Sequence, residues 1–430
     1  MKVYLASLGC KLNWAEIETF ARELVARGHQ VVSAPEEADW AIVNTCTVTH
    51  IAARKSRRLI RHLRRCNSRL RLAVVGCYAE VSPQEVKDLG ADLVLGNLDK
   101  EKVVEKLLAF EGGEDVPLPH QGSHPVVRGR TRAFVKIQDG CDNRCTYCIV
   151  TIARGPSRSR RPEEVVAEIK ERVAEGYQEI VPTGVNIGAY GRDKSSHGRV
   201  PLEEGWSLER LVRTILKQTS VPRLRLSSIE PWDLDPGMLA LWEDSRLCRH
   251  LHLPLQSGSD TVLRRMGRKY STAQYAALVE EVHRHIPGVG LTTDVIVGFP
   301  GETEEEFSQS LRFVQEMAFS RVHVFRYSRR AGTAAARMKD QVPPSVIQER
   351  SARMLALARR LARDFHQRFI GQELQVLFEN LAGENTWQGL TDNYIRVWVR
   401  TERDLHNTIA WVRAFAADEE GLQAILQESV

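Results

Sequence analysis

The stretch RAFVKIQDGCDNRCTYCIV (residues 132–150) runs from an apolar strand pattern directly into a loop that holds three cysteines. Cys141, Cys145 and Cys148 are spaced four and then three residues apart, with polar residues between them. A closed structural zinc site takes four ligands, usually from paired cysteines or histidines. Thiolates are the standard ligands of iron–sulfur clusters. Three thiolates without a fourth therefore predict a four-iron cluster that leaves one iron open to a substrate or cofactor.

A zinc site is the alternative for this loop. His120 and His124 precede the loop and could supply a fourth ligand. No compact ligand spacing ties these histidines to the cysteines, so the pattern favours the iron–sulfur cluster.

Strand patterns continue after the loop, with helical patterns between them. Six strand–helix units are too few for a closed eight-unit barrel, so the sequence predicts a partial barrel or an open α/β sheet. A long amphipathic helix pattern at residues 345–370 closes this part of the chain. The six expected strands lie within residues 132–140, 177–184, 222–228, 250–256, 289–298 and 321–328.

The two flanking parts of the chain have different patterns. Near the start, strand patterns at residues 2–9, 40–45, 71–76 and 92–97 alternate with helical ones, which predicts βαβ units and a parallel sheet. Near the end, strand patterns at residues 373–381, 385–400 and 411–418 are joined by turns, which predicts a small β-barrel. A stretch rich in Gly, Pro and His at residues 111–130 indicates a linker. The expected domains are residues 1–125, 126–368 and 369–430.

Three further cysteines share one context. Cys10, Cys46 and Cys77 each stand just past the carboxyl end of a predicted parallel strand, the edge where open α/β sheets bind ligands. We therefore expect the three thiols to converge on a second metal site, although any single cysteine could be a small buried apolar residue. Cys66 and Cys248 do not fit this pattern and are predicted to be structural.

Composition and charge narrow the class of protein. The 430 residues are 43% hydrophobic and contain no run long enough to span a membrane, and the start is too polar for a secretory signal. We expect a cytoplasmic protein whose eight cysteines are ligands or free thiols. The net charge is +5, and a basic segment at residues 53–72 predicts either a solvated helix or a surface that contacts nucleic-acid phosphates.

These motifs resemble those of known families. CDNRCTYC after a strand is similar to the radical S-adenosylmethionine (SAM) superfamily. LGCKLNWAEIE, VNTCTVTHIAARKSR and VVGCYAE resemble the amino-terminal domain of the methylthiotransferases, and GLTDNYIRV resembles the RNA-binding TRAM domain. Trp14, where a more polar residue is expected, and Pro182, inside a strand pattern, depart from the family pattern.

The resemblance extends to one branch of the family. GCKLN, TCTVTHIAARKSR and GCYAE are most similar to the branch that methylthiolates N6-threonylcarbamoyladenosine next to the anticodon of tRNA. Other branches act on isopentenyl-adenosine in tRNA or on an aspartate of a ribosomal protein. A non-enzymatic iron–sulfur or zinc RNA-binding protein is the alternative from another class.

The resemblance also implies a chemistry and its partners. A four-iron, four-sulfur cluster on Cys141, Cys145 and Cys148 would give one electron to SAM, and the resulting 5′-deoxyadenosyl radical would take hydrogen from carbon 2 of the adenine. A second such cluster on the other cysteine trio would deliver sulfur, with SAM as methyl donor and no catalytic acid or base. The partners would be a tRNA anticodon stem-loop, a flavodoxin- or ferredoxin-type reductase and a sulfur source. The oligomeric state stays open.

Two sets of contact residues are expected from the same resemblance. For the cofactor or substrate they are Tyr147, Thr183, Gly184, Asn186, Glu230 and Gln256. RNA contacts are expected in the RRPEE and GRKY segments, on the basic helix and in the last domain, the residues being Arg54, Arg57, Arg58, Arg61, Arg396 and Tyr394.

Overall fold

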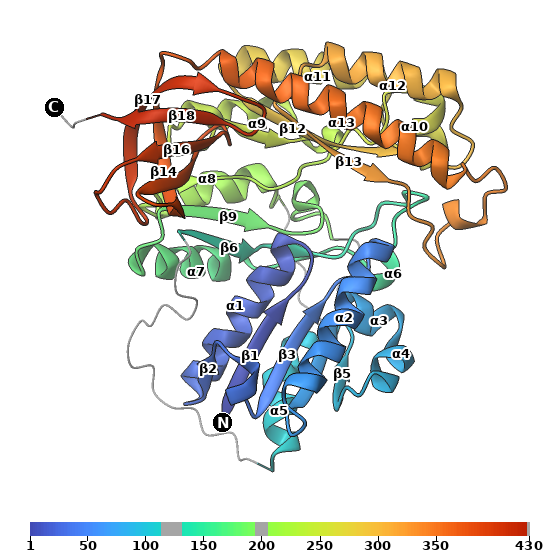
Figure 1. Ribbon diagram of the computed structural model, residues 1–430, viewed down its shortest axis with the longest axis vertical. Helices are drawn as coiled ribbons and strands as arrows, with labels where there is room; N and C mark the ends of the chain where they lie inside the picture. Colours follow the sequence, from blue (N-terminus) through green and yellow to red (C-terminus); the bar gives the residue numbers. More distant parts are fainter. Residues whose placement is uncertain (113–130, 194–204, 428–430) are drawn as a thin grey trace.

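Three units follow one another along the chain in the computed structural model, which describes residues 1–112, 131–193 and 205–427 (Figure 1). They are a five-stranded parallel sheet, a six-stranded α/β unit and a closed β-barrel. Most of the predicted linker, with His120 and His124, lies outside the described residues, so the boundary at residue 125 stays a prediction.

The first unit is a parallel sheet with strand order β2-β1-β3-β4-β5, as the strand patterns predicted. Of the strands in this unit, only β2, at the edge of the sheet, was not predicted. The strands are β1 (Lys2–Ser7), β2 (Gln30–Val32), β3 (Trp40–Thr45), β4 (Arg71–Gly76) and β5 (Leu93–Leu95).

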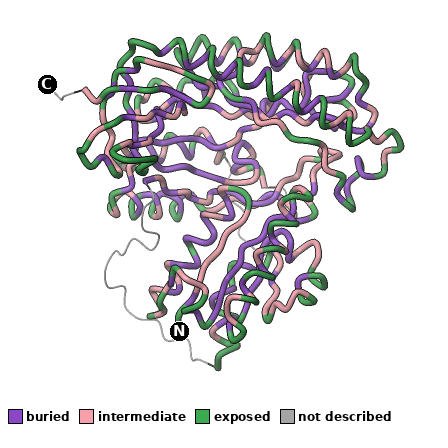
Figure 2. The backbone as a smooth tube through the Cα atoms, viewed as in Figure 1, coloured by how far each residue is buried: buried purple, intermediate pink, exposed green. Residues whose placement is uncertain are grey.

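Helices cover both faces of this sheet because alternate residues of each strand point to opposite sides. Trp40 and Ile42 of β3 pack with α1 and α5, whereas Ala41 and Val43 pack with α2, α3 and α4. The central strands β3 and β4 are buried and the outer helix faces are exposed (Figure 2). The helices are α1 (Lys11–Ala26), α2 (His50–Cys66), α3 (Cys77–Val81), α4 (Pro83–Asp88) and α5 (Val103–Phe110).

The second unit contains all six predicted strands, all parallel to their neighbours, so the partial-barrel prediction is confirmed. They form two three-stranded sheets, β6-β9-β10 and β11-β12-β13, which isolated bridges from Leu224 to Leu247 and from Ser228 to His252 connect. Pro182 is accommodated near the end of β9, beyond the part that pairs with β10. The strands are β6 (Arg132–Lys136), β9 (Glu179–Thr183), β10 (Arg223–Leu224), β11 (His250–His252), β12 (Gly290–Val297) and β13 (Arg321–Arg326), and the short β7 (Gln138–Asp139) and β8 (Arg158–Ser159) form a separate pair.

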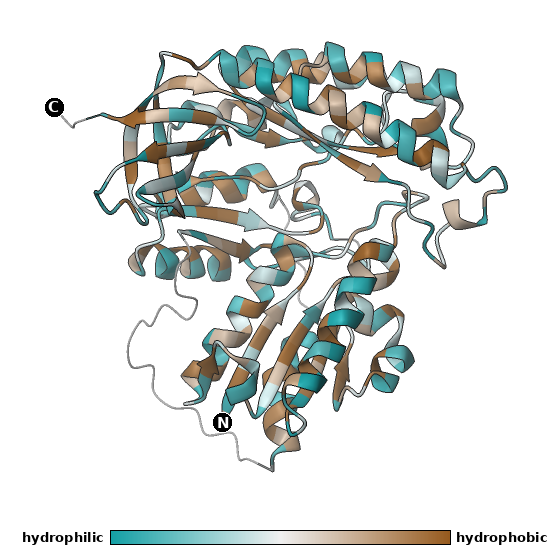
Figure 3. Cartoon of the chain, in the orientation of Figure 1, coloured by the Kyte–Doolittle hydropathy of each residue, from teal (hydrophilic) through white to brown (hydrophobic). Residues whose placement is uncertain are grey.

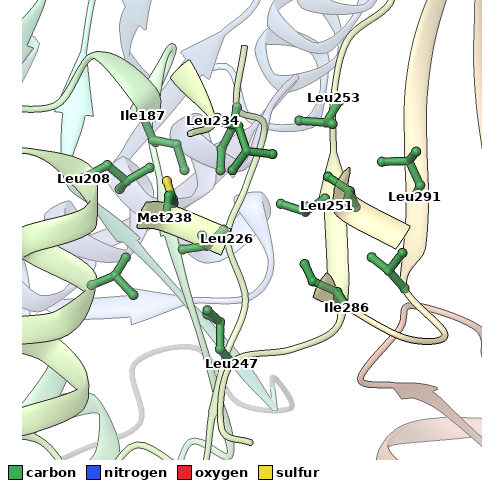
Figure 4. Close-up of a cluster of buried hydrophobic side chains, with 14 of the residues drawn as sticks. Ile187, Leu208, Leu226, Leu234, Met238, Leu247, Leu251, Leu253, Ile286 and Leu291 are labelled. Carbon is green, nitrogen blue, oxygen red and sulfur yellow. The ribbon is translucent and has the colours of Figure 1, made fainter. Parts of the chain in front are cut away.

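The outer face of this partial barrel is apolar and its inner face is polar. Leu251 of β11 lies in a buried apolar cluster with Leu226 and Met238 (Figure 4). His250 and His252 alternate with Leu251 along the strand and therefore point to the opposite, inner face. The outer helices turn hydrophilic faces to solvent (Figure 3). These helices are α6 (Val150–Arg154), α7 (Pro162–Ala174), α8 (Leu208–Gln218), α9 (Pro236–Leu239), α10 (Asp260–Met266), α11 (Thr272–His285), α12 (Glu304–Glu316) and α13 (Pro344–Gln367).

The third unit is the predicted small β-barrel, closed in the order β14-β15-β16-β18-β17. It docks at the amino ends of the partial-barrel strands, where Arg225 donates to the carbonyl oxygens of Thr391 (3.0 Å) and Asp392 (2.7 Å). Strand β18 was missed, although its alternation of buried and exposed residues is a strand signal. The strands are β14 (Glu373–Gly383), β15 (Thr386–Thr391), β16 (Arg396–Arg400), β17 (Ile409–Ala417) and β18 (Leu422–Leu426).

Across the described residues, every helix is too short or too polar to cross a membrane.

Candidate active site

The first cysteine trio lies in the loop that leaves the carboxyl end of β6. Cys141, Cys145 and Cys148 are partly exposed and line an open cavity of about 540 Å³, which Gly332 and Thr333 border from the opposite side. Burial, together with the neighbouring Cys145, raises the pKa of the Cys148 thiol to about 12. A bound metal would compensate the negative charge of such thiols and hold them as thiolates.

The second trio gathers at the rim of the first sheet. Cys10 is the residue before α1, Cys46 follows β3, and Cys77 begins α3 directly after β4. Because β1, β3 and β4 are neighbours, these three strand ends are adjacent, and they flank the point between β1 and β3 where the strand order reverses. Burial raises the pKa of Cys46 to about 12, and Cys77 and Cys10 add to the rise.

Two glycines let the strand ends of this rim pack closely. Gly9 has φ +108°, and a Cβ atom there would lie 2.8 Å from the Cys46 sulfur. Gly76 has φ +93°, and a Cβ atom there would lie 2.9 Å from the carbonyl oxygen of Thr45. A side chain at either position would push a cysteine-bearing loop out of place.

Helix α6 connects the two trios. It begins two residues after Cys148 and ends at Arg154, whose guanidinium donates to Asn13 Oδ1 (2.5 Å) in α1. The same guanidinium donates to Asp139 Oδ1 at 2.8 Å. Both Cys10 and Cys77 raise the pKa of Arg154 electrostatically, after burial, which lowers it. The Arg154 charge therefore lies close to the second trio.

The segment after β13 forms a second connection. Arg330 donates to Thr47 Oγ1 (2.6 Å), next to Cys46. A few residues further on, the Ala335 amide donates to the carbonyl oxygen of Thr146 (2.8 Å), inside the first cysteine loop. One short segment thus touches the neighbours of both trios.

Each trio consists of three cysteine thiols. Three thiolates are a donor set that suits an iron–sulfur cluster, in which each thiolate binds a different iron. Among the described residues, no three His, Cys, Asp or Glu side chains converge as they would around one metal ion. The first turn of α1 has no side-chain cap and no acidic residue, so its free N–H groups favour an anionic cluster beside Cys10.

The residues after β9 form a fixed loop. Gln138 Oε1 accepts hydrogen bonds from the Val185 and Asn186 amides. A Cβ atom at Gly184 would lie 2.9 Å from the Gln138 carbonyl oxygen, so this glycine permits the close approach of the residues that follow β6. Asn186 Oδ1 is buried without a hydrogen-bond partner. Thr183 is buried beside them.

Glu230, an expected ligand contact, forms an ion pair with Arg268. The sequence had predicted a different role for Arg268. Arg268 of the GRKY segment was assigned to an RNA-binding rim, but it is buried, forms an ion pair with Glu230 and donates to the Cys145 sulfur at 3.5 Å. No local pattern distinguishes such a buried arginine from a solvated one. Tyr147, the other expected cofactor contact in this loop, packs edge-to-face on Phe299.

Gln256 has a strained backbone at the end of the strand segment that follows β11. Its φ is +66°, although it is not a glycine, and its amide donates to the carbonyl oxygen of Asp294 at 2.7 Å. Such strain in a residue that is 9% exposed is typical of functional sites.

The residues expected to contact RNA lie partly on α2 of the first unit and partly in the small barrel. Arg54, Arg58 and Arg61 are exposed on α2, while Arg57 is turned toward Tyr78 and Glu85. Arg396 is half-buried in β16.

Tyr394, an expected RNA contact, is partly buried against the partial barrel. The Tyr394 ring stacks on His250 with 4.4 Å between ring centroids, and the Arg225 guanidinium lies 5.0 Å from the ring. The alternation of β16 indicated which residues point out of the small barrel, but not which of these the partial barrel covers.

The two remaining cysteines lie away from the trios. Cys248 is buried, with its sulfur 3.8 Å from Glu179 Oε2. Cys66 ends α2, and its sulfur lies 3.4 Å from His62 Nε2. Neither is placed to join a cluster.

Comparisons with known proteins match this architecture. Residues 135–314 match the radical SAM superfamily, and residues 2–96 match the uncharacterized protein family UPF0004. The chain is 38% identical to the threonylcarbamoyladenosine tRNA methylthiotransferase MtaB of Bacillus subtilis, covering 96% of this chain and 93% of that one. The chain belongs to the radical SAM tRNA methylthiotransferases. Members of this family use SAM and a four-iron, four-sulfur cluster.

Further relatives come from two branches of the family. The MtaB protein of Thermotoga maritima is 39% identical, with 92% of this chain and 90% of that one covered. The tRNA-2-methylthio-N(6)-dimethylallyladenosine synthase of Anoxybacillus flavithermus is 36% identical, with 89% and 74% covered. The radical SAM methyltransferase TsrM of Kitasatospora setae has a similar fold, with a TM-score of 0.58 at 15% identity over 83% of this chain and 89% of that one.

Proposed function

We propose that this methylthiotransferase places a methylthio group on carbon 2 of N6-threonylcarbamoyladenosine, next to the anticodon of a cytoplasmic tRNA. The observation that carries the proposal is the pair of cysteine trios at the carboxyl ends of two parallel sheets, connected by α6. The relatives named for threonylcarbamoyladenosine support the choice of base.

We assign Cys141, Cys145 and Cys148 to the cluster that binds SAM, and Cys10, Cys46 and Cys77 to a second four-iron cluster. When bound, these groups supply a one-electron route for replacing the carbon 2 hydrogen, which is not acidic enough for a side-chain base. The chain binds and orients the groups and excludes water. A flavodoxin- or ferredoxin-type reductase and a sulfur source complete the proposal.

The protein's own residues have positioning roles in this scheme. Arg268 donates to the Cys145 sulfur, which would stabilise negative charge on the first trio. Arg154 brings a buried positive charge to the second trio. The exposed arginines Arg54, Arg58 and Arg61 on α2 are suited to tRNA phosphates.

Nucleoside mass spectrometry of tRNA from cells with and without the gene tests the base. We expect the methylthio form of threonylcarbamoyladenosine to disappear and its precursor to accumulate. The second candidate is the dimethylallyl base, because relatives of that branch are 36–37% identical. Loss of methylthio-dimethylallyladenosine instead would select that candidate.

Two cysteine variants test whether the first trio serves SAM cleavage and the second trio serves methylthio transfer. Cys145→Ala should abolish SAM cleavage under reducing, oxygen-free conditions. Cys77→Ala should keep SAM cleavage and lose the methylthio product. Unchanged product in either variant would contradict the cluster assignments.

A further inference from the structure

The ammonium group of Lys11 lies inside the partial barrel without a partner. Lys11 is the first residue of α1, directly after Cys10. Among the described residues it forms no ion pair and no side-chain hydrogen bond. It is partly exposed, and the groups that interact with it electrostatically are the Tyr394 hydroxyl, Arg132, Arg225 and Glu179, which come from the barrel interior and its docked end. An unpaired cation in such an interior raises the free energy of the folded state unless a ligand pairs with it.

The surrounding charges leave this interior with a positive surplus. Glu179, the carboxylate that acts on Lys11, is already held by Arg225 (2.7 Å) and Arg223 (3.0 Å). Arg132 is engaged by Glu379 at 2.8 Å. The carboxylate that acts most directly on Lys11 is therefore already neutralised by arginines.

Two of the inward histidines, His250 and His323, add polar groups without adding charge. His250 is buried among Arg225, Lys11, His252 and His323, and its Nδ1 has no hydrogen-bond partner. The pKa of His323 is lowered to about 4, chiefly by burial, so this ring is neutral at physiological pH. Asp294, the acidic residue on β12, lies 3.3 Å from His252 Nε2.

The chemistry of the proposed substrate matches this environment. A threonylcarbamoyl group carries a carboxylate that is ionised at neutral pH, whereas a dimethylallyl group is neutral and apolar. The nitrogen that carries either group, N6, is bonded to carbon 6 of the adenine ring. One ring atom lies between carbon 6 and carbon 2. When carbon 2 faces the clusters, the N6 group is therefore within a few atoms of the residue beside Cys10.

We propose that Lys11 binds the threonyl carboxylate and thereby selects threonylcarbamoyladenosine over bases with a neutral N6 group. The inference rests on the proposed function, because it assigns the part of that substrate which this site recognises. Lys11 is a specificity residue and takes no part in the replacement of hydrogen by sulfur.

The test compares two anticodon stem-loop RNAs that differ only in the threonyl carboxylate, which is free in one and a methyl ester in the other. Binding is measured by fluorescence anisotropy for the wild type, Lys11→Met, Lys11→Arg and the matched control Lys170→Met, on the exposed face of α7. A hydrogen bond between charged groups predicts that the wild type binds the free acid about tenfold to a hundredfold more tightly than the ester. We expect Lys11→Met to lose this preference, Lys11→Arg to keep part of it and Lys170→Met to keep all of it.

The outcomes separate the inference from the function on which it rests. A wild type that binds acid and ester equally, or a Lys11→Met variant that retains the preference, overturns the role of Lys11. Iron content and RNA-independent SAM cleavage check that each variant is intact, and the wild-type comparison stands even if a variant does not fold. If the wild type adds no methylthio group to the acid RNA but modifies dimethylallyl RNA, the proposed base is wrong.

Discussion

Glu179 joins the partial barrel to the small C-terminal barrel, and its removal has a calculable effect. The carboxylate is fully buried and forms ion pairs with Arg225 and Arg223. Arg225 in turn donates to the carbonyl oxygens of Thr391 and Asp392 in the small barrel. Glu179→Gln keeps the shape of the side chain but leaves two buried arginines without their counter-charge.

The size of the effect follows from the pKa of Glu179. Burial alone would raise this pKa, but Arg225 and Arg223 outweigh it and hold the value at about 2, against 4.5 for an unperturbed glutamate. A folded-state pKa below the unfolded one stabilises the fold above pH 4.5, and this contribution is lost as pH falls toward 2. The difference corresponds to about 3 kcal/mol at pH 7 and about 1.5 kcal/mol at pH 3.

Urea unfolding followed by tryptophan fluorescence measures this contribution, because Trp387 and Trp398 report on the small barrel. We expect Glu179→Gln to destabilise docking of that barrel by about 3 kcal/mol at pH 7, and by roughly half as much at pH 3. Glu281→Gln, which breaks an exposed ion pair with Arg284, should cost less than about 1 kcal/mol. A Glu179→Gln effect below 1 kcal/mol, or one that does not change with pH, would refute the reasoning.

Three further predictions concern the other positioning residues. Arg268→Met should retain the full iron content and make the first cluster harder to reduce, measured by redox titration with electron paramagnetic resonance; an unchanged potential would exclude its role. Arg154→Met should lower the free energy of unfolding by about 3–5 kcal/mol, with thermal denaturation as the measurement, because it removes a buried ion pair. Replacing Arg54, Arg58 and Arg61 by Ser should reduce the slope of log affinity for the stem-loop against log salt by about 2 to 3, and an unchanged slope would exclude phosphate contacts there.

Strand periodicity was sufficient to predict that three distant cysteines would stand at one edge of one sheet. The end of a parallel strand can be located from its apolar run, and parallel strands share one carboxyl edge, so Cys10, Cys46 and Cys77 could be placed together before the fold was known. The strand order, which sets β1, β3 and β4 side by side, could not be derived this way. It depends on which helix packs on which face.

The cations that face the interior of the partial barrel could not be predicted from the sequence. Arg268 and Lys11 stand in polar segments, where a positive charge is normally solvated. Their positions depend on partners far away in the chain: Arg268 pairs with Glu230, and Lys11 reaches an interior that the small barrel closes. Tyr394 illustrates the converse, because a residue pointing out of one domain can be covered by the next.

The interface between the first sheet and the partial barrel contains a network of buried charged side chains. Lys100 approaches Glu16 at 2.6 Å, and Lys136 approaches Asp139 at 3.0 Å, while Arg154 binds both carboxylates. Buried ion pairs add little net stability, since desolvation offsets much of their attraction. An apolar interface tolerates small sliding movements. In this network, by contrast, each charged group keeps its partner only when the two units are aligned as they are here. That register sets the distance between the trios, so the Arg154→Met variant should lose methylthio transfer at temperatures where it is still folded and cleaves SAM.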